Sequence, residues 1–445
     1  MSIYKFIDSS DNDKSYNYKI LVYPNITFQK DLEKDSYVVV LGNIIRELNK
    51  VRDDIHWTIL SPQHIESLDL ENTNQLILPM PSYPNAMRLH FDQKTIIKAI
   101  DFKKNDYDIV YSHLPEHTLQ LKNVFLNETN IEPKFIGYTH WTEFPEITNY
   151  AATVMDINFL GLLEMDKCGV NTQGQKNLIL KNAKTHFNDD VINRLDEILE
   201  PQYLGWEIPK YEKETTDKKI IVFNHRPHAY KNYPWFLEQM DKLWKIRKDF
   251  EVWVPLAESK EREYMTIDKY DRKGYFSKLS SCYVGVCAKQ KYSGWAISAT
   301  DGMSVGVPYL FSDDDYYHEL ANDAGLYYND NEFVDKIDNL LDMENLRNEW
   351  SDKSLKRFEE GKWENSIIPF NNMINDTIEN LPMLKSDTDT YKKVVDFIHR
   401  KKSVTKKDIL HMLNWGVRIS FSGYRNRLRN EPTIRFTKDR YEVIE

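Results

Sequence analysis

Strand-like apolar runs alternate with helix-like amphipathic stretches in two successive series along this 445-residue chain, and no other feature restricts its fold as much. The runs of the first series cover residues 19–23, 57–60, 107–111 and 134–138, and those of the second cover 219–223, 251–255, 282–286 and 307–311. Such alternation is typical of βαβ units whose strands form a parallel sheet. The sequence therefore predicts an α/β protein with two Rossmann-like domains.

The breaks around these series set the expected domain boundaries. Pro201 and Gly205 lie in a segment after the first series that is typical of a hinge. Helical patterns at 331–379 are followed by the polar stretch 385–390, which we interpret as a linker. We therefore expect domains at 1–203, 204–382 and 388–445. Because ligands of open parallel sheets bind beyond the carboxyl ends of the strands, the cleft between the first two domains is the expected active site.

Charge is distributed unevenly between the C-terminal segment and the rest of the chain. Residues 385–445 hold 15 Lys and Arg against 8 Asp and Glu, a balance of +7, whereas the remainder holds 44 against 61, a balance of −17. A basic appendage favours binding to phosphate polymers, because each cation that neutralises a phosphate releases counterions. The alternative interpretation is a solvated tail with scattered surface charge.

The sequence predicts neither a membrane protein nor a metalloprotein. Residues 1–19 are polar, and no apolar run approaches the roughly 20 residues that span a bilayer. Cys168, Cys282 and Cys287 lack the closely paired spacing of a zinc site. We therefore expect a cytoplasmic protein with reduced, buried thiols and no bound metal.

The basic segment predicts three short helices followed by a hairpin. Apolar residues recur at helical spacing in 391–400, Thr405 is placed to cap a helix at 406–413, and a turn at 415–416 precedes a third helix at 424–429. Residues 433–444 alternate in the manner of a β-hairpin. This order is typical of a winged helix-turn-helix domain.

The cationic side chains and one amide in this segment are of types that bind DNA. Arg and Asn side chains bind phosphates and purine edges, and here they cluster on the third predicted helix and extend along the hairpin. The predicted DNA-binding residues are Arg425, Asn426, Arg427, Arg429, Arg435, Lys438 and Arg440. Winged helices also dock proteins, so a protein-binding role is the alternative.

A second candidate site follows the strand-like run 219–223. Arg226 and Lys231 lie between this run and the helix-like stretch 233–246, at the expected carboxyl end of a strand. Paired cations at that position can hold a diphosphate and neutralise charge as it leaves. Two solvated surface cations are the alternative interpretation, and a role for His225 and His228 as metal ligands lacks a third ligand.

The stretch from Ser293 to Pro308 reads SGWAISATDGMSVGVP, and the buried strand YLFSD follows it. It resembles the nucleotide-sugar site of family 4 retaining glycosyltransferases, where a Glu and a Gly-rich turn precede a second Glu that opens a helix before a Gly-Val-Pro turn. The resemblance covers about 219–320 and implies a GT-B architecture. It also implies that Asp301 accepts hydrogen bonds from the ribose and that the turn at 293–296 lies against the sugar and phosphates. The donor-binding residues that we predict are Asn224, Arg226, Lys231, Ser293, Gly294, Trp295, Ala296 and Asp301.

The first domain resembles the same family at one strand end. Gly137 to Trp141 resembles the segment in which the family places a His beside the transferred sugar, which implies a catalytic role for His140. Glu143 and Glu146 follow closely and suit a general base for the acceptor hydroxyl. The alternatives are a cleft histidine with a structural role and exposed loop carboxylates.

The chain also departs from the family pattern. Ser293 stands where the family has its first Glu, and the Gly-rich loop after the first strand is replaced by residues 23–28. Ser312 and the three aspartates at 313–315 have the composition of the metal motif of a different, single-sheet class of glycosyltransferase. That class would leave the preceding motif without a role, so we do not favour it.

Together these features predict a glycosyltransferase that moves a sugar from a nucleotide sugar, expected to be a UDP-sugar, to double-stranded DNA. The combination resembles the base-modifying glycosyltransferases of bacterial viruses, whose acceptor is a hydroxylated base such as 5-hydroxymethylcytosine in the host cytoplasm. Arg226 and Lys231 would also act in catalysis, together with His140 and Glu143. No permanently bound cofactor is expected. The alternatives are a cell-envelope polysaccharide transferase and a DNA-binding protein whose transferase body has decayed.

Overall fold

The computed structural model describes residues 5–8, 16–25, 36–62, 68, 70–78, 91–102, 105, 107–129, 133–140, 151–290, 295–379, 381, 388–412, 428, 431–437 and 440–444. The chain divides into two compact units. The first comprises Met1–Gly169, Ala183–Glu200 and Pro369–Glu445, and the second comprises Val170–Asn182 and Pro201–Ile368. The domain boundaries expected from the sequence stay predictions.

Within the described residues, the first unit contains an eight-stranded sheet in the order β1-β4-β3-β2-β5-β6-β7-β8. Strand β2 pairs in parallel with β3 and β5, as do β3 with β4 and β5 with β6, whereas β1 pairs antiparallel with β4. From β4 to β7 the strands follow the order of a Rossmann fold, which reverses between β2 and β5. The strands are β1 (Lys5–Asp8), β2 (Tyr18–Tyr23), β3 (Ile55–Pro62), β4 (Thr73–Leu78), β5 (Ile109–Ser112), β6 (Lys134–Thr139), β7 (Lys167–Val170) and β8 (Leu199–Pro201).

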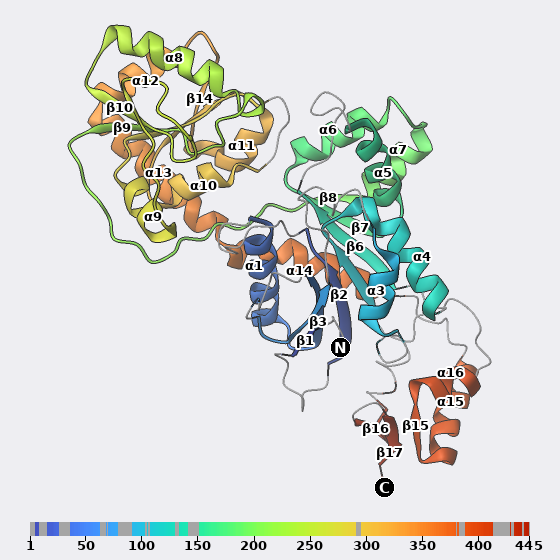
Figure 1. The fold of residues 1–445 in the computed structure, drawn as a ribbon. Helices are drawn as coiled ribbons and strands as arrows, with labels where there is room; N and C mark the ends of the chain where they lie inside the picture. Colours follow the sequence, from blue (N-terminus) through green and yellow to red (C-terminus); the bar gives the residue numbers. More distant parts are fainter. Residues whose placement is uncertain are drawn as a thin grey trace. The chain divides into compact units, whose positions relative to one another are not determined.

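Helices cover both faces of this sheet (Figure 1). Alternate residues of each strand point to opposite faces, so Ile20 packs toward α1 and α14 whereas Leu21 packs toward α3 and α4. The helices that surround the first sheet or connect its strands are α1 (Ser36–Val51), α3 (Gln93–Ile100), η2 (Pro115–His117), α4 (Thr118–Thr129), α5 (Ala151–Leu163), α6 (Gln173–Ala183), α7 (Asp189–Ile198) and α14 (Trp363–Glu379). Within the described residues, no helix is both long and apolar enough to cross a membrane.

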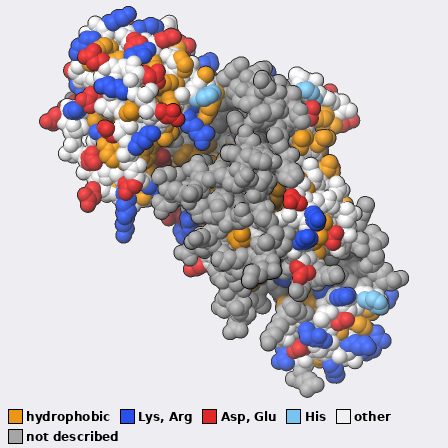
Figure 2. Space-filling model, in the orientation of Figure 1, with side chains coloured by type: hydrophobic (Ala, Val, Ile, Leu, Met, Phe, Trp, Pro, Cys, Tyr) orange, Lys and Arg blue, Asp and Glu red, His pale blue; other side chains and the backbone are white. Residues whose placement is uncertain are grey.

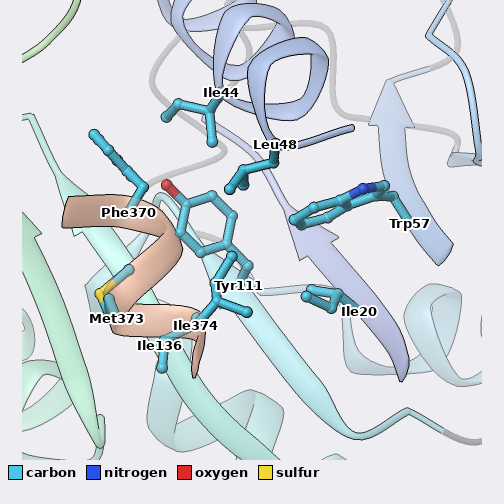
Figure 3. A pocket seen from close by; sticks show the side chains of 9 residues that line it. All are labelled: Ile20, Ile44, Leu48, Trp57, Tyr111, Ile136, Phe370, Met373 and Ile374. Carbon is cyan, nitrogen blue, oxygen red and sulfur yellow. The ribbon is translucent and has the colours of Figure 1, made fainter. Parts of the chain in front are cut away.

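The face under α1 and α14 contains a narrow apolar crevice (Figure 3). It has no space for a water molecule, and Figure 3 shows the hydroxyl of Tyr111 directed toward Ile44 of α1 and Phe370 of α14. That hydroxyl is buried and has no hydrogen-bond partner among the described residues. The crevice is therefore a feature of core packing and not a ligand site.

The second unit contains a six-stranded sheet in the order β11-β10-β9-β12-β13-β14, again counted over the described residues. Neighbouring strands of this sheet pair in parallel, and the strand order is again that of a Rossmann fold, which reverses between β9 and β12. The strands are β9 (Lys219–Val222), β10 (Phe250–Trp253), β11 (Met265–Thr266), β12 (Val284–Cys287), β13 (Tyr309–Ser312) and β14 (Gly325–Tyr328).

Two layers of helices enclose this second sheet (Figure 1). One hydrophobic cluster joins the sheet to α8 and α12, and a second joins its other face to α9, α10, α11 and α13. The helices are η3 (Ala229–Lys231), α8 (Tyr233–Ile246), α9 (Arg272–Ser280), α10 (Ile297–Ser304), α11 (Asp315–Ala321), η4 (Asn322–Ala324), α12 (Phe333–Asp342) and α13 (Glu344–Gly361).

Local sequence explains where the helices near the β9–β12 reversal begin. Pro234 lies in the first turn of α8, where a missing N–H removes no helical hydrogen bond. Asp271 precedes α9, and its side chain accepts a hydrogen bond from the backbone N–H of Gly274 at 2.8 Å. These starts fix the two helices that flank the polar residues described below.

The C-terminal segment forms a small antiparallel sheet in the order β15-β17-β16. Its elements are α15 (Thr388–Lys401), β15 (Ser403–Thr405), α16 (Lys406–Met412), β16 (Ile434–Thr437) and β17 (Arg440–Val443). The predicted hairpin is confirmed. The predicted cap is also confirmed, because the Oγ1 of Thr405 accepts a hydrogen bond from the backbone N–H of Asp408 at 3.2 Å.

Two details of this segment differ from the sequence interpretation. Residues 388–390, which we interpreted as part of a linker, form the first turn of α15. β15 was not expected, and it adds a third strand by pairing with β17. The turn at 415–416 lies outside the described residues, as does all of the predicted helix at 424–429 except Leu428, which is buried in the small core around Val394 and Tyr441.

Candidate active site

Two loops meet beyond the carboxyl ends of β9 and β12, where the strand order of the second sheet reverses. We call residues 223–232 the β9 loop. Nζ of Lys231 donates a hydrogen bond to Oε1 of Gln290 at 2.7 Å, and Nε2 of His225 lies 3.1 Å from Sγ of Cys287. Reversal points of this kind are where open parallel sheets bind ligands. The predicted phosphate loop thus lies at the point where the strand order of the second sheet reverses.

Lys231 and Arg226 form a pair of neighbouring cations in the β9 loop. Burial is the main reason that the pKa of Lys231 falls to about 8; the Cys287 thiol opposes the shift, and the charge of Arg226 adds to it. Arg226 is exposed, and over the described residues no carboxylate pairs with either cation. The loop therefore concentrates positive charge without a counter-ion in the described part of the chain, which suits an anionic ligand.

The side chain of His225 holds the β9 loop through contacts at both ring nitrogens. Its Nδ1 lies 2.6 Å from Oγ of Ser298 on α10, and its Nε2 faces Cys287. Burial, with a smaller contribution from the charge of Lys231, lowers the pKa of His225 to about 3, so the ring is neutral at pH 7. A neutral imidazole has one donor and one acceptor nitrogen, which matches two partners that can each donate or accept.

Asn224 connects this loop to α9 and α10. Its amide nitrogen donates to the hydroxyl of Tyr275 at 2.8 Å and to the backbone oxygen of Ser298 at 2.6 Å. Its amide oxygen accepts from the hydroxyl of Tyr309 at 3.0 Å. The side chain is buried. Its three contacts are all internal, so the structure places Asn224 as a support for the loop and not at its surface.

Asp301 is joined to the β9 loop through this network. The hydroxyl of Tyr275 donates to Oδ2 of Asp301 at 3.4 Å and accepts from Asn224. Burial raises the pKa of Asp301 to about 7, Arg272 opposes the rise and Glu207 adds to it. Asp301 and Asn224 of the β9 loop are thus connected through two hydrogen bonds that share the hydroxyl of Tyr275.

A bulky ring holds α10 against the sheet. The side chain of Tyr309 lies where a Cβ on Gly302 would come within 2.2 Å of its ring, and a Cβ on Gly285 would do the same. The backbone oxygen of Ser298 lies 3.1 Å from the hydroxyl of Tyr309 and shares the single proton of that hydroxyl with Asn224. Two glycines, one in α10 and one in β12, therefore make room for the ring that positions the start of α10.

The remaining predicted donor residues lie at the start of α10. Ala296 is buried, and its side chain does not cap the helix. The ring of Trp295 is half-buried and lies 5.8 Å from the ring of Tyr203. Several predicted residues fall outside the described part of the chain: Glu143, Glu146, Ser293, Gly294, Arg425, Asn426, Arg427, Arg429 and Lys438.

His140 lies at the end of β6 in the first unit, close to a second histidine that the sequence did not indicate. Its Nε2 lies 3.4 Å from Nδ1 of His113, which follows β5. Burial lowers the pKa of His113 to about 3; burial and then the charge of His113 lower that of His140. The rings of Tyr37 and Tyr138 meet His140 edge-on, with centroids 4.6 and 4.9 Å away. His140 is therefore neutral at pH 7 and held by aromatic contacts.

Sequence reasoning also missed polar residues near the reversal point of the first sheet. The hydroxyl of Tyr23, at the end of β2, lies 2.9 Å from Nδ1 of His117. The neighbouring carboxylate of Glu116 is buried and accepts a hydrogen bond from Asn158 at 2.8 Å. These residues carry no sequence motif, because strand ends and a short 3-10 helix bring them together only in the fold.

Two of the aspartates at 313–315 contact neighbouring side chains. Asp313 lies 2.7 Å from Nε2 of His318, and Asp314 accepts from Ser312 at 2.6 Å and faces Lys289 at 3.7 Å. No group of three His, Cys, Asp or Glu side chains that could hold a metal ion occurs in the described ranges. The three cysteines are buried and unbridged, as expected.

In the C-terminal segment, the two predicted DNA-binding cations that the structure describes are both engaged within the protein. Nε of Arg435 lies 3.4 Å from a carboxylate oxygen of Glu442. Arg440 donates to the hydroxyl of Ser403 at 2.6 Å and to its backbone oxygen at 3.2 Å. These bonds brace the small sheet, so Arg435 and Arg440 each have a structural role besides any contact with DNA.

Solved structures of glycosyltransferases share this fold. Sucrose-phosphate synthase from Thermosynechococcus elongatus matches with a TM-score of 0.62 and 11% identity over 80% of this chain and 98% of its own. Trehalose-6-phosphate synthase OtsA matches with a TM-score of 0.59 and 12% identity over 81% of this chain and 98% of its own. Anabaena HepE in complex with UDP and glucose matches with a TM-score of 0.58 and 10% identity over 82% of this chain and 100% of its own. No protein-family model and no curated protein sequence matches this chain.

These likenesses define the class of fold. Each covers about four fifths of this chain and nearly all of the other protein, and the structures concerned are GT-B glycosyltransferases. The expected GT-B fold, with two parallel α/β sheets, is thus confirmed. Because the identities are low, the likeness extends to the fold and not to the acceptor.

Proposed function

We propose that this protein transfers a sugar from a nucleotide sugar, a UDP-sugar, to a hydroxylated base in DNA. The observation that carries the donor half is the pair of cations in the β9 loop. Arg226 and Lys231 lie at the reversal point of the second sheet without a carboxylate partner among the described residues. A diphosphate would supply the missing negative charge there.

In this proposal the cations act during bond cleavage. The bond between the anomeric carbon and the diphosphate oxygen breaks, and the electron pair goes to the leaving nucleoside diphosphate. Arg226 and Lys231 stabilise that developing charge, an effect that grows in a partly buried site. A bond forms between the anomeric carbon and the acceptor oxygen, whose proton passes to a general base; Glu143 and Glu146 are the candidates, and His140 is proposed to contact the transferred sugar.

Asp301 is proposed to bind the ribose. Its carboxylate, half-buried beside Tyr275, can accept hydrogen bonds from two neighbouring hydroxyls. The turn of Ser293, Gly294, Trp295 and Ala296 is proposed to contact the sugar and phosphates, because it leads directly into α10. HepE was crystallised with UDP, which supports UDP as the nucleotide.

Asn224 and His225 have a different proposed role. Both are buried and fully engaged with neighbouring side chains, as the contacts to Tyr275, Tyr309, Ser298 and Cys287 show. They hold the β9 loop in place, so that Arg226 and Lys231 keep a fixed position. We therefore propose Asn224 as a positioning residue and not as a direct contact of the donor.

The acceptor half rests on the C-terminal segment. A helix, a strand, a second helix and a hairpin follow one another, and the first strand pairs with the last, an arrangement typical of winged helices. The segment from 385 to 445 has a charge balance of +7 beside a body of −17. We propose that it binds double-stranded DNA and that the target base leaves the stack to reach the transferase.

The competing acceptor is a carbohydrate. Two of the similar structures are named as synthases of sucrose phosphate and trehalose-6-phosphate, and this favours a sugar hydroxyl as acceptor. In that case the C-terminal segment would bind another protein or a polysaccharide. The same donor chemistry serves both proposals.

The test is incubation with a panel of UDP-sugars and of DNAs that contain ordinary or hydroxymethylated bases, followed by mass measurement of the nucleosides. We expect a mass increase of one sugar residue on a hydroxylated base. Sugar transfer to oligosaccharides but to no DNA would overturn the acceptor assignment. Failure to consume any nucleotide sugar, or to be thermally stabilised by UDP, would overturn the donor assignment.

The phosphate assignment has a sharper test. Arg226→Ala should leave folding and DNA binding intact, because Arg226 is exposed, and should lower turnover by roughly 10²–10³-fold, the usual cost of losing one such charge-stabilising group. Arg194→Ala is the matched control, since Arg194 is an exposed residue of α7 that pairs only weakly with Glu197. Unchanged turnover in Arg226→Ala would refute the role.

A further inference from the structure

The C-terminal segment has an open polar groove, and none of the residues that line it is among the predicted DNA-binding residues. It is lined by Lys393, Asp396, His399, Arg400 and Lys402, all on α15 or just after it. Figure 2 shows Lys and Arg side chains gathered over this part of the molecule, with a histidine among them. We call these five residues the α15 groove.

The cations of the α15 groove are uncommitted. Lys393, Arg400 and Lys402 are exposed, and none forms a side-chain hydrogen bond or ion pair with a described residue. Asp396 lies one helical turn from both Lys393 and Arg400 yet does not pair with either of them within 4 Å in the described structure. The positive charge is thus available to a ligand.

The two described DNA-binding candidates on the hairpin, by contrast, already have partners within the protein. Arg435 pairs with Glu442, and Arg440 is bonded to Ser403. A cation that already has a partner must exchange it for a phosphate, which reduces the net gain on binding. Lys393, Arg400 and Lys402 are therefore more available to a phosphate than Arg435 and Arg440.

We propose that the α15 groove binds the phosphodiester backbone of duplex DNA, as a second contact beside the predicted third helix. This inference rests on the proposed DNA acceptor and deepens it. Lys393, Arg400 and Lys402 each face one phosphate, and because they contact no base edge, they add affinity without sequence preference. His399 holds the groove wall, since its Nε2 lies 3.0 Å from the hydroxyl of Thr433 before β16.

A structural alternative exists for part of this charge. Arg400 and Lys401 lie in the last turn of α15, where cations stabilise the helix through its dipole. That role does not account for Lys393, which lies in the N-terminal half of the helix, or for Lys402, which follows it. The test must therefore separate helix stability from DNA binding.

The experiment compares the full-length protein with a triple variant, Lys393→Gln, Arg400→Gln and Lys402→Gln, on two duplexes of unrelated sequence. The control triple variant is Lys181→Gln, Lys184→Gln and Lys356→Gln, which removes three exposed cations from the second unit and the segment after α6. Binding is measured between 50 and 200 mM salt. Thermal unfolding of each variant shows whether α15 keeps its stability.

Each phosphate contact makes affinity fall by about 3.5-fold over that fourfold range of salt, since the slope is roughly −0.9 per contact. Loss of three contacts should therefore shrink the total fall by about 40-fold, equally on both duplexes. The control should keep the wild-type slope. An unchanged slope in the groove variant, with DNA binding intact, would overturn the groove assignment and leave the DNA acceptor standing.

Two other outcomes are informative. If the wild-type protein binds neither duplex but does bind poly-L-glutamate, the groove serves an acidic protein surface, and both this inference and the DNA acceptor fail. Consumption of UDP-sugar is measured in parallel, because it depends on the second unit. If the wild-type protein consumed no UDP-sugar, that result would argue against the donor assignment alone.

Discussion

The hydroxyl of Ser298 lies 2.6 Å from Nδ1 of His225, and this contact ties the start of α10 to the loop that carries Arg226 and Lys231. His225 is buried, and its other nitrogen faces Cys287. A ring that is held on both sides has one orientation. The position of the β9 loop therefore depends on α10, the helix that also carries Asp301.

Ser298→Ala should test this coupling. Removing one partner of a buried imidazole costs about 1–3 kcal/mol in the free energy of unfolding, because the ring nitrogen loses its hydrogen bond. It should also weaken donor binding, since the β9 loop is no longer fixed. Chemical denaturation and the KM for the UDP-sugar measure the two effects. Ser281→Ala, at the end of α9, is the control and should change neither by much, because its hydroxyl only bonds a backbone oxygen at a helix end.

Donor affinity should depend on pH with two opposed limbs. Lys231, with a pKa of about 8, binds a diphosphate in its charged form, so affinity falls as pH rises through 8. Asp301, with a pKa of about 7, accepts ribose hydrogen bonds best when ionised, so affinity falls as pH drops through 7. UDP binding measured by calorimetry from pH 6 to 9 should show a maximum between these values. Asp301→Asn should abolish only the acidic limb, and a wild-type profile that is flat over this range would contradict both roles.

Asp301 should also make the free protein less stable above neutral pH. A carboxyl whose pKa is higher in the folded state than in the unfolded state binds its proton more tightly when folded, so its favourable contribution is lost as pH rises toward 7. Asp301→Asn should therefore raise the melting temperature relative to wild type at pH 8 and change it little at pH 4. Scanning calorimetry at the two values checks this; a variant less stable than wild type at pH 8 would show that the carboxylate is stabilised by its neighbours instead.

The elements that the sequence predicted best are those with a strong local pattern. The helix expected at 233–246 is α8 without change, and Arg226 and Lys231 were found because they directly follow β9. β4 was missed because it begins with polar residues. Gln75 in that strand is buried, and it forms hydrogen bonds with the side chain of Ser61 and the backbone of Leu68. A polar residue at a buried position breaks the apolar pattern by which a strand is recognised in the sequence.

The supporting residues of the site could not be predicted for a different reason. Gln290, Tyr275 and Ser298 contact the β9 loop from segments 51 to 74 residues away in the chain. Nothing in local periodicity indicates such pairs. The resemblance to known transferases identified Asp301, but only the fold shows that Tyr275 joins it to Asn224.

Two buried tyrosines should respond in opposite ways to loss of their hydroxyl. Tyr309→Phe removes bonds to Asn224 and to the backbone of Ser298 and should lower the free energy of unfolding by about 1–3 kcal/mol. Tyr111→Phe removes a buried hydroxyl without a described partner and should be neutral or stabilising, because the desolvation cost disappears. Denaturant titration of both variants makes the comparison, and equal losses would contradict it.

Glycine at 302 should be essential to the site because the ring of Tyr309 occupies the place of a side chain there. A Cβ there would lie 2.2–2.6 Å from the ring and hydroxyl of Tyr309, which is fully buried and cannot withdraw. Gly302→Ala should therefore lower the free energy of unfolding by about 1–3 kcal/mol, the usual cost of overpacking, and should displace α10 enough to weaken UDP binding. Gly42→Ala is the matched control in α1, where the new methyl meets only the flexible end of Arg46 at 3.1 Å. Because alanine is favoured over glycine in a helix by roughly 0.5–1 kcal/mol, the control should be neutral or more stable than wild type. If Gly302→Ala behaved like Gly42→Ala in denaturation and in UDP affinity, then Tyr309 would not be what positions α10.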